Sequence, residues 1–314
     1  MKQIFSFIAI LLPFWLSGQD QVAFYVQAHA DDWQLFMSKN IEEEVKFARI
    51  VIITMTAGDA GHGSLPYGKG KIPYYLAREK GAVYSSKFVG DIMATEVEDI
   101  PQCKFSSING HQIACYTYKN RIVNYFLRLP DGLSGEGVPE TGYQSLTKLK
   151  NGSLKTIAAV DNSTLYKGWD DLLQTIKSIV IKERNNDEQV WINTHSSDLK
   201  FNDGDHADHY ATAHAVQESA EELPWAGIVS WMGYRCRKLP PNLEPQDLIN
   251  ASSIFSAYAW SLMESGYGEC FDNAHRRFLP NDFFKVTKQP TFDSFSDQVN
   301  DWLKATKRKV NRVL

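Results

Sequence analysis

Apolar residues along the chain fall into two patterns, short continuous runs and longer stretches with the spacing of one helix face. Residues 22–26 (VAFYV) and 49–54 (RIVIIT) are short runs of β-branched and aromatic side chains, typical of strands that are covered on both faces. Between them, large apolar residues recur at helical spacing, namely Trp33, Phe36, Met37, Ile41 and Val45. The pattern therefore predicts a strand, a helix and a second strand in this order.

The same alternation continues to the C-terminus. Further helices are predicted over 72–89, around 169–180, from about 206, over 249–264 and near the C-terminus. Further strands are predicted over 121–129, 189–194 and 227–232, together with a hairpin around 103–115. This order predicts an α/β fold, a mainly parallel sheet with helices on both faces and an inserted β-hairpin. Because no linker or repeat interrupts the pattern, we expect one domain over 19–314, with a C-terminal extension from about residue 225.

The first eighteen residues have the pattern of a secretory signal peptide. Lys2 precedes an apolar stretch over 4–16, which small and polar residues (SGQDQ) follow. The apolar stretch is shorter than the roughly 20 residues that a membrane span requires. We therefore expect cleavage after Gly18 and export to the periplasm or the extracellular space, with no transmembrane span in the mature chain. A retained N-terminal anchor is the alternative interpretation.

Export to an oxidising compartment would allow the cysteines to form disulfides. Cys103 and Cys115 bracket the predicted hairpin, whose turn contains the pair Asn109–Gly110. A three-residue loop over 108–110 would place the two cysteines directly opposite each other. We therefore expect a cross-strand disulfide, which an oxidising compartment would permit, with buried free thiols as the alternative.

Charge and motif content exclude several functions. The net charge of −4 over 314 residues disfavours a nucleic-acid binder, which usually carries a basic field. The four cysteines lack paired C-x-x-C spacing, which disfavours a thiolate zinc site, and Cys236 and Cys270 are a candidate second pair. The loop AGDAGHG contains no G-x-G-x-x-G, so it is not a dinucleotide fingerprint.

Two histidine and aspartate clusters carry the candidate chemistry. The first, HADDW, contains His29 and Asp32 at the carboxyl end of the first predicted strand. The second, HADH, contains His209 and follows the strand over 189–194. Ligands of open α/β sheets bind at this edge, and two imidazoles with one carboxylate suit a catalytic zinc ion that keeps an open position. For the first cluster alone, a helix cap by Asp31 or Asp32 is the alternative.

At these residues the chain resembles the LmbE-like (PIG-L) family of zinc-dependent N-deacetylases, which carry His-Pro-Asp-Asp-Glu and His-Pro-Asp-His. The resemblance spans about 22–216 and implies a Rossmann-like sheet and one zinc ion per chain, held by His29, Asp32 and His209. It also implies that Asp31 is the general base and that His206 stabilises the oxyanion or protonates the departing amine. Asp208 is expected to orient His206; the alternative is an acidic residue favoured by the helix dipole.

Departures from the family motifs and the outer residues concern the substrate. Alanines stand at 30 and 207 in place of prolines, and Trp33 replaces the family glutamate. Trp33 is a candidate sugar platform, although its spacing favours a core role. The resemblance suggests Asp131 in LPDG as a contact for sugar hydroxyls, with turn chemistry as the alternative. Arg78 is a candidate substrate contact, although we expect a solvated helix charge. His62 is a candidate to reach the pocket, whereas His195 is expected to have a structural or surface role.

These inferences combine into one expected function. The chain is expected to be an exported zinc hydrolase that removes an acetyl group from an N-acetylated sugar or glycoconjugate, with water as second substrate and no organic cofactor. The same ligand set accepts iron or cobalt. The alternatives are an amidase on a non-sugar amide and a non-catalytic carbohydrate-binding protein of the same fold. A phosphoesterase is disfavoured, because two-metal sites need more carboxylate ligands.

Overall fold

The computed structural model describes residues 21–291, except 93, 95, 97, 185–188, 269 and 270. The predicted signal peptide, the predicted C-terminal helix and Cys270 lie outside the described residues.

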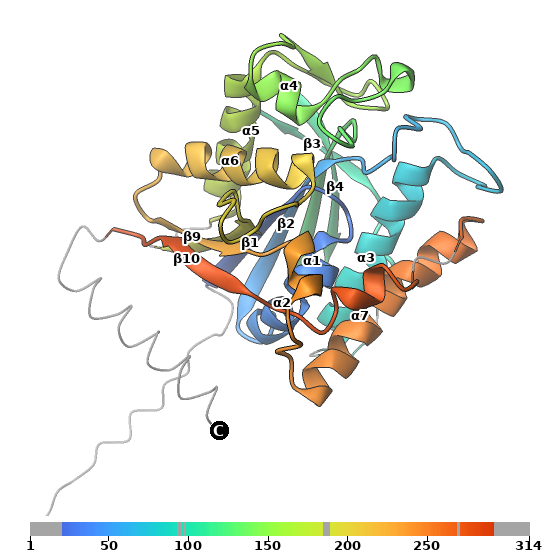
Figure 1. The fold of residues 1–314 in the computed structure, drawn as a ribbon, viewed down its shortest axis with the longest axis vertical. Coiled ribbons are helices and arrows are strands. Elements are labelled where there is room, and N and C mark those ends of the chain that lie inside the picture. Colours follow the sequence, from blue (N-terminus) through green and yellow to red (C-terminus); the bar gives the residue numbers. More distant parts are fainter. Residues whose placement is uncertain are drawn as a thin grey trace, which may run out of the picture.

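An eight-stranded sheet forms the centre of the molecule, with the strand order β10-β9-β8-β1-β2-β5-β4-β3 (Figure 1). The strands are β1 (Gln21–Gln27), β2 (Ala48–Thr56), β3 (Lys104–Ile108), β4 (His111–Tyr118), β5 (Ile122–Leu129), β8 (Val190–His195), β9 (Ala226–Trp231) and β10 (Phe284–Lys288). The five strands from β9 to β5 are parallel to one another, whereas β10, β4 and β3 pair antiparallel with their neighbours. The predicted α/β class, with a mainly parallel sheet and an inserted hairpin, is confirmed.

Helices cover both faces of the sheet (Figure 1). One face carries α1 (Asp32–Phe36), α2 (Ser38–Glu44), α3 (Tyr74–Ile92) and α7 (Pro245–Glu264); the other carries α4 (Leu146–Lys150), α5 (Trp169–Glu183) and α6 (Ala207–Glu221). Each face of the sheet packs against its helices in a separate hydrophobic core, and alternate residues of β1 point into the two cores. Tyr25 lies in the core beside α1, α2, α3 and α7, Phe24 lies in the core beside α4, α5 and α6, and both are fully buried. Burying a side chain of this size stabilises the fold by roughly 1.5–3 kcal/mol.

Several short elements lie outside the predicted pattern. The helix predicted after β1 is divided into α1 and α2 at Met37, whose φ of −138° is not helical. Strand β10 was not predicted; it is a short strand at the edge of the sheet, and its residues FKVTK are largely exposed. A small sheet of β6 (Ile157–Ala158) and β7 (Leu165–Tyr166) and three 3₁₀ helices complete the fold: η1 (Pro139–Thr141), η2 (Tyr234–Lys238) and η3 (His275–Arg277). No helix within the described part of the chain combines the length and the apolar character that crossing a membrane requires.

The hairpin forms where it was predicted, but the expected register is wrong. Ile108 pairs with His111, so the turn contains only Asn109 and Gly110, whose φ angles are +51° and +79°. Positive φ at both central residues is the signature of a two-residue turn. The one-residue difference places Lys104, not Cys103, opposite Cys115. Cys103 therefore precedes β3 and is exposed, whereas Cys115 is buried within β4, and both are free thiols.

The order of the strands determines where a ligand can bind. The chain runs from β1 outward to β2 and β5, and returns on the other side of β1 to β8 and β9. The order of the parallel strands therefore reverses between β1 and β8. Loops leave this point in opposite directions and open a crevice at the carboxyl ends of the strands. Both histidine and aspartate clusters follow these two strands.

The hairpin register leads to a prediction about the thiols. In the folded chain, Cys103 should react with a thiol reagent soon after mixing. Cys115 and Cys236 should react only after unfolding, because burial raises the pKa of both thiols, that of Cys236 to about 12. Mass spectrometry of labelled peptides measures the difference. A Cys103–Cys115 disulfide in peptides mapped without reduction would contradict the observed register.

Candidate functional site

A cavity of ≈ 140 Å³ lies at the carboxyl ends of β1 and β8. Its walls come from five regions of the chain: the β1–α1 turn, α3, the loop after β5, the entrance of α6, and the segments from η2 to η3. The lining residues are His29, Asp31, Asp32, Leu35, Tyr74, Arg78, Asp131, His206, Tyr234, Tyr258, Leu262, His275 and Phe278. The volume is below the roughly 300–1,000 Å³ of drug-sized pockets, so this end of the site fits a small chemical group.

Three of the predicted ligand atoms converge beside this cavity. His29 Nδ1 lies 3.2 Å from His209 Nε2 and 3.6 Å from Asp32 Oδ1, and His209 Nε2 lies 3.2 Å from Asp32 Oδ1. A zinc ion bound tetrahedrally by nitrogen and oxygen at 2.0–2.1 Å requires ligand atoms about 3.3–3.4 Å apart. These three atoms, which we call the ligand triangle, therefore have the spacing of a metal site without any rearrangement. All three residues are buried.

Asp32 is held in place by hydrogen bonds to its other oxygen. The backbone N–H of His29 donates to Asp32 Oδ2 at 2.7 Å, and His195 Nε2 lies 2.9 Å from the same oxygen. Asp31 occupies the N-cap position of α1, but its side chain accepts no capping hydrogen bond. Neither aspartate therefore caps the helix, which leaves the metal interpretation of the cluster in place.

His209 has a carboxylate partner that the sequence motifs did not indicate. Its Nδ1 donates to Asp205 Oδ1 at 2.9 Å, so its Nε2 is left for the metal. Asp205 is fixed in turn by Asn202 Nδ2 at 2.6 Å and by the backbone N–H of Tyr234 at 3.0 Å. The only signal in the sequence was its position four residues before His209, one helical turn away.

His195 also belongs to the surroundings of the ligands. Its ring is fully buried and stacks on that of His209, with centroids 3.8 Å apart and an interplanar angle of 13°. Burial, together with the neighbouring His209, lowers the pKa of His195 and keeps the ring neutral. The expected structural role is therefore specific: His195 donates to Asp32 and supports the ring of His209.

In the ligand triangle, the charge of each residue changes the pKa of its neighbours. Burial alone would lower the pKa of His209, but Asp205 and Asp32 outweigh it and raise this pKa to about 10 in the metal-free chain. Burial would raise the pKa of Asp32, but the three neighbouring imidazoles lower it well below its usual range. A metal ion binding here must displace the proton of His209, and it takes over the charge compensation that this proton provides.

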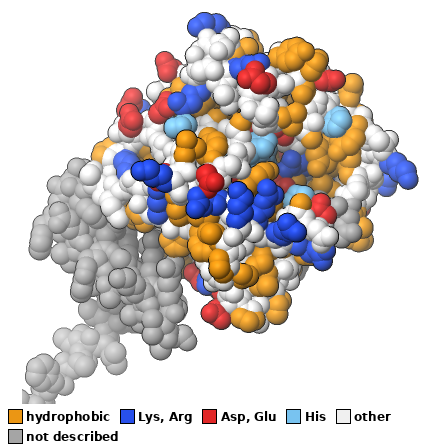
Figure 2. Space-filling view, viewed as in Figure 1, with side chains coloured by type: hydrophobic (Ala, Val, Ile, Leu, Met, Phe, Trp, Pro, Cys, Tyr) orange, Lys and Arg blue, Asp and Glu red, His pale blue; other side chains and the backbone are white. Residues whose placement is uncertain are grey.

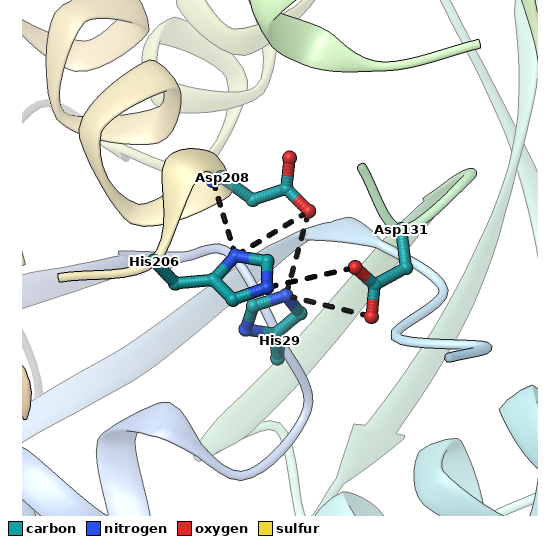
Figure 3. A group of neighbouring side chains, drawn as sticks. All are labelled: His29, Asp131, His206 and Asp208. Carbon is teal, nitrogen blue, oxygen red and sulfur yellow. Dashed lines mark hydrogen bonds and ion pairs between the residues drawn. The ribbon is translucent and has the colours of Figure 1, made fainter. Parts of the chain in front are cut away.

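His206, Asp131 and Asp208 surround the other side of the His29 ring (Figure 3). His29 Nε2 is 3.5 Å from Asp208 Oδ2 and 3.9 Å from Asp131 Oδ2. His206 Nε2 lies 3.8 Å from Asp131 Oδ1. The four residues come from the β1–α1 turn, the loop after β5 and the entrance of α6. Sequence-distant segments thus place two imidazoles between two carboxylates.

The backbone of Asp208, rather than its carboxylate, orients His206. The N–H of Asp208 donates to His206 Nδ1 at 3.2 Å, which leaves the proton of a neutral ring on Nε2. Burial and the positive charges of His29 and His209 lower the pKa of His206 to about 3. The Asp208 carboxylate accepts the N–H of Gly132 at 2.9 Å and lies nearer to His29, and burial raises its pKa.

Arg78 is buried, so its expected role as a solvated helix charge is wrong. Its Nη2 forms a short ion pair with Asp31 Oδ1, its Nη1 donates to the carbonyl of Gly58 at 2.9 Å, and its Nε donates to Tyr258 Oη at 2.8 Å. All three contacts fix the guanidinium beside the predicted base. Within the described part of the chain, no hydrogen bond involves the second oxygen of Asp31.

The outer candidate residues are placed differently from one another. Asp131 lines the cavity; its N–H donates to Asp59 Oδ1 at 2.8 Å, and its Oδ1 accepts the N–H of Leu133 at 2.8 Å. Trp33 is fully buried in the core beneath α1 and does not line the cavity. His62 is exposed and stacks on Tyr67, with ring centroids 3.7 Å apart, away from the cavity lining.

Aromatic residues beyond residue 225 close the cavity, and the sequence motifs did not indicate them. Tyr234 lies edge-on to His209, with centroids 5.3 Å apart, and stacks on Phe278 at 5.2 Å. Both rings line the cavity, as do Tyr258 and His275. The predicted C-terminal extension thus supplies one wall of the site. No motif marks these positions, because only the packing of η2, α7 and η3 brings them to the cavity.

The chain matches no protein-family model and no curated protein. It is similar to several solved structures. The zinc-inhibited form of teicoplanin deacetylase Orf2 is 14% identical, with 82% of this chain and 90% of that chain covered and a TM-score of 0.44. N,N′-diacetylchitobiose deacetylase from Pyrococcus horikoshii is 13% identical, with 88% of each chain covered and a TM-score of 0.45.

A third similar structure is a different kind of enzyme. GalB, the 4-carboxy-2-hydroxymuconate hydratase from Pseudomonas putida KT2440, is 11% identical, with 83% of this chain and 82% of that chain covered and a TM-score of 0.43. Two deacetylases and a hydratase are thus among the structures to which the chain is similar. At these identities and TM-scores, the similarity assigns no activity to this chain.

The hydrogen bond between Asp205 and His209 leads to a prediction. Asp205→Asn retains the size of the side chain but removes its charge, so the ring of His209 becomes a weaker and less fixed ligand. We expect zinc affinity to fall by about 10–100-fold, the usual effect of losing such a partner. Titration against a competing chelator measures it. Asp203→Asn, two residues away on the surface and paired with Arg235, is the matched control and should leave the affinity unchanged; equal affinities for both variants would contradict the role of Asp205.

Proposed function

We propose that this chain is a metal-dependent hydrolase that removes the acetyl group from an N-acetylated sugar or glycoconjugate. The observation that carries the proposal is the arrangement around one small cavity: three convergent ligand atoms, a carboxylate held beside them by Arg78, and a neutral imidazole of His206. Amide hydrolysis requires each of these functions, namely an electrophile, a base and a donor for the oxyanion. A protein that only bound sugars would need none of them.

The residues fit a divalent metal, and zinc suits them best. Two imidazole nitrogens and one carboxylate oxygen are a catalytic zinc set, and each ligand has its own hydrogen-bond or carboxylate partner. When bound, such an ion polarises the acetamide carbonyl and lowers the pKa of water towards neutrality. His29, Asp32 and His209 would hold it.

Asp31 is suited to move the proton. Arg78 holds Oδ1 of its carboxylate, so Oδ2 is available to take a proton from the attacking water. The new bond forms between the water oxygen and the acetyl carbon. When the carbon–nitrogen bond breaks, Asp31 returns this proton to the departing nitrogen. The products are acetate and a free amine, and the base regains its initial charge.

His206 is suited to stabilise the oxyanion rather than to protonate the amine. Its Nδ1 is occupied by the N–H of Asp208, so Nε2 carries the proton and faces the cavity region near Asp131. Because the pKa of His206 is lowered to about 3, its ring is neutral near pH 7. The ring can then donate one hydrogen bond but has no additional proton to give to the amine. Its N–H would therefore bind the carbonyl oxygen as charge develops there.

Asp131 and the aromatic wall fit a sugar that carries the acetamide. Asp131 lines the cavity; its backbone N–H is held by the Asp59 carboxylate, and its own carboxylate accepts the N–H of Leu133, so it is placed to accept hydrogen bonds from hydroxyl groups. Tyr74 and Tyr234 also line the cavity, and aromatic side chains of this kind pack against the apolar side of a pyranose. Export, supported by the sequence of residues 1–18, would bring the enzyme to extracytoplasmic glycans.

The neighbouring aspartates should fail in different ways. Asp31→Asn preserves the three ligands, so zinc content should stay near stoichiometric while turnover falls by about 10²–10⁴-fold, the usual contribution of a positioned base. Asp32→Ala removes a ligand, so both zinc content and acetate release should fall. Metal content by mass spectrometry and acetate release from N-acetylated sugars measure the two effects.

Excess zinc separates the variants further. It should partly restore Asp32→Ala and should have no effect on Asp31→Asn, because the second variant lacks a base and not a ligand. Loss of zinc from Asp31→Asn with retention in Asp32→Ala would reverse the assigned roles. Wild-type protein that holds zinc but releases no acetate from any N-acetylated sugar would contradict the proposed activity.

A further inference from the structure

Two short segments at the mouth of the cavity are rich in cations. η2 contributes Arg235, Arg237 and Lys238, and η3 contributes Arg276 and Arg277. All except Arg235 are exposed. Lys and Arg side chains gather in a band across the middle of one face, beside histidine side chains (Figure 2). We call these five residues the basic rim. The net charge of the whole chain is −4, so the rim opposes the average character of the molecule.

Both segments that carry the basic rim contribute residues to the cavity lining. Tyr234, the first residue of η2, lines the cavity, and so do His275 in η3 and Phe278 immediately after it. The guanidinium carbon of Arg237 lies 5.6 Å from the ring centroids of both Tyr234 and Phe278. A group that leaves the cavity past these two rings therefore meets Arg237.

Most of these charges have no carboxylate partner. Arg235 forms a short ion pair with Asp203. For Arg237, Lys238, Arg276 and Arg277, no carboxylate of the described residues lies within 4.0 Å. Unpaired surface cations attract anions and raise their local concentration. The rim thus has four positive charges that form no ion pair with a carboxylate in the described part of the chain.

The interior of the cavity differs from its mouth. Asp31, Asp32 and Asp131 line it, and its one lining arginine, Arg78, is occupied by Asp31 and by Gly58. The cations that are free to pair with an anionic group of the substrate therefore lie at the mouth of the cavity rather than among its inner lining residues.

We propose that the substrate carries an anionic group, a phosphate or a carboxylate, on the part of the molecule that lies outside the cavity, and that the basic rim binds it. This inference rests on the proposed function, because it assigns the acetamide end to the cavity. Arginine suits the task, since its planar guanidinium binds carboxylate and phosphate through two parallel hydrogen bonds. The substrate class is then an acidic N-acetylated glycoconjugate, not a neutral oligosaccharide.

Matched pairs of substrates test the proposal. N-acetylglucosamine is compared with N-acetylglucosamine 1-phosphate, and N,N′-diacetylchitobiose with its C1-oxidised acid, which adds one carboxylate. For the zinc-loaded full-length chain, we expect the anionic member of at least one pair to have a KM about 5- to 20-fold lower than its neutral partner at low salt. High salt should remove most of this difference, because it screens exposed charges.

A double variant assigns the effect to the rim. Arg237→Gln with Arg277→Gln should raise KM for the anionic substrate by about 5- to 20-fold, leave kcat unchanged, and change the neutral substrate less than about twofold. Lys46→Gln with Lys104→Gln is the matched control, since it removes two exposed charges beside the amino ends of β2 and β3, away from the cavity. It should have no effect on either substrate.

Binding separates this proposal from the proposed activity. Calorimetric titration of both pairs into the Asp31→Asn protein reports the preference for anions even if no substrate is turned over. Acetate release without any preference for the anionic members overturns the rim proposal and leaves the deacetylase proposal intact. If the protein prefers the anionic members in binding, and this preference depends on the rim, but no substrate releases acetate, the rim proposal stands and the deacetylase proposal is overturned. Rim-dependent binding to phosphatidylglycerol vesicles, without preference among the sugars, would assign the rim to a membrane surface and overturn the proposal.

Discussion

The carboxylate of Asp32 is the group on which the site depends, because its two oxygens connect the two halves of the chain. Oδ2 is fixed by the backbone of His29 from the β1–α1 turn and by His195 from the end of β8. Oδ1 is thereby directed at His29 Nδ1 and His209 Nε2. The parallel pairing of β1 with β8 sets this geometry, since it aligns the carboxyl ends of both strands. The ligand triangle is therefore a consequence of the point at which the strand order reverses.

Buried negative charge is the second constraint. Asp31, Asp32, Asp131, Asp205 and Asp208 gather at this edge of the sheet, and Arg78 pairs with only one of them. Uncompensated buried carboxylates are costly, so the imidazoles between them must take up protons or a cation must replace those protons. A divalent metal meets this demand at the ligand triangle. The exposed cations of the basic rim lie at the mouth of the same cavity. The two ends of a substrate would therefore lie in different electrostatic environments.

The sequence predicted the parts of the site that lie within motifs and missed those that depend on packing. The two clusters and the strands before them indicated the ligands, because residue type and position along a strand are local properties. Asp205, His195 and Tyr234 act through contacts that form only when β8, η2 and α6 have packed, so the sequence motifs did not indicate them. The hairpin was predicted in the correct place, but its register depended on whether Asn109–Gly110 turned alone or with a third residue. A difference of one residue in the turn was enough to separate the two cysteines.

Anomalous X-ray diffraction at the zinc absorption edge, on crystals of the zinc-loaded protein, can locate the metal directly. We expect one strong peak per chain, about 2.0–2.1 Å from His29 Nδ1, Asp32 Oδ1 and His209 Nε2. Asp31 and His206 should lie beside this peak without coordinating it. A peak on the opposite side of the His29 ring, bound by Nε2 together with Asp131, His206 and Asp208, would contradict the assignment of the ligands. The absence of any peak in this region would contradict the metal centre itself.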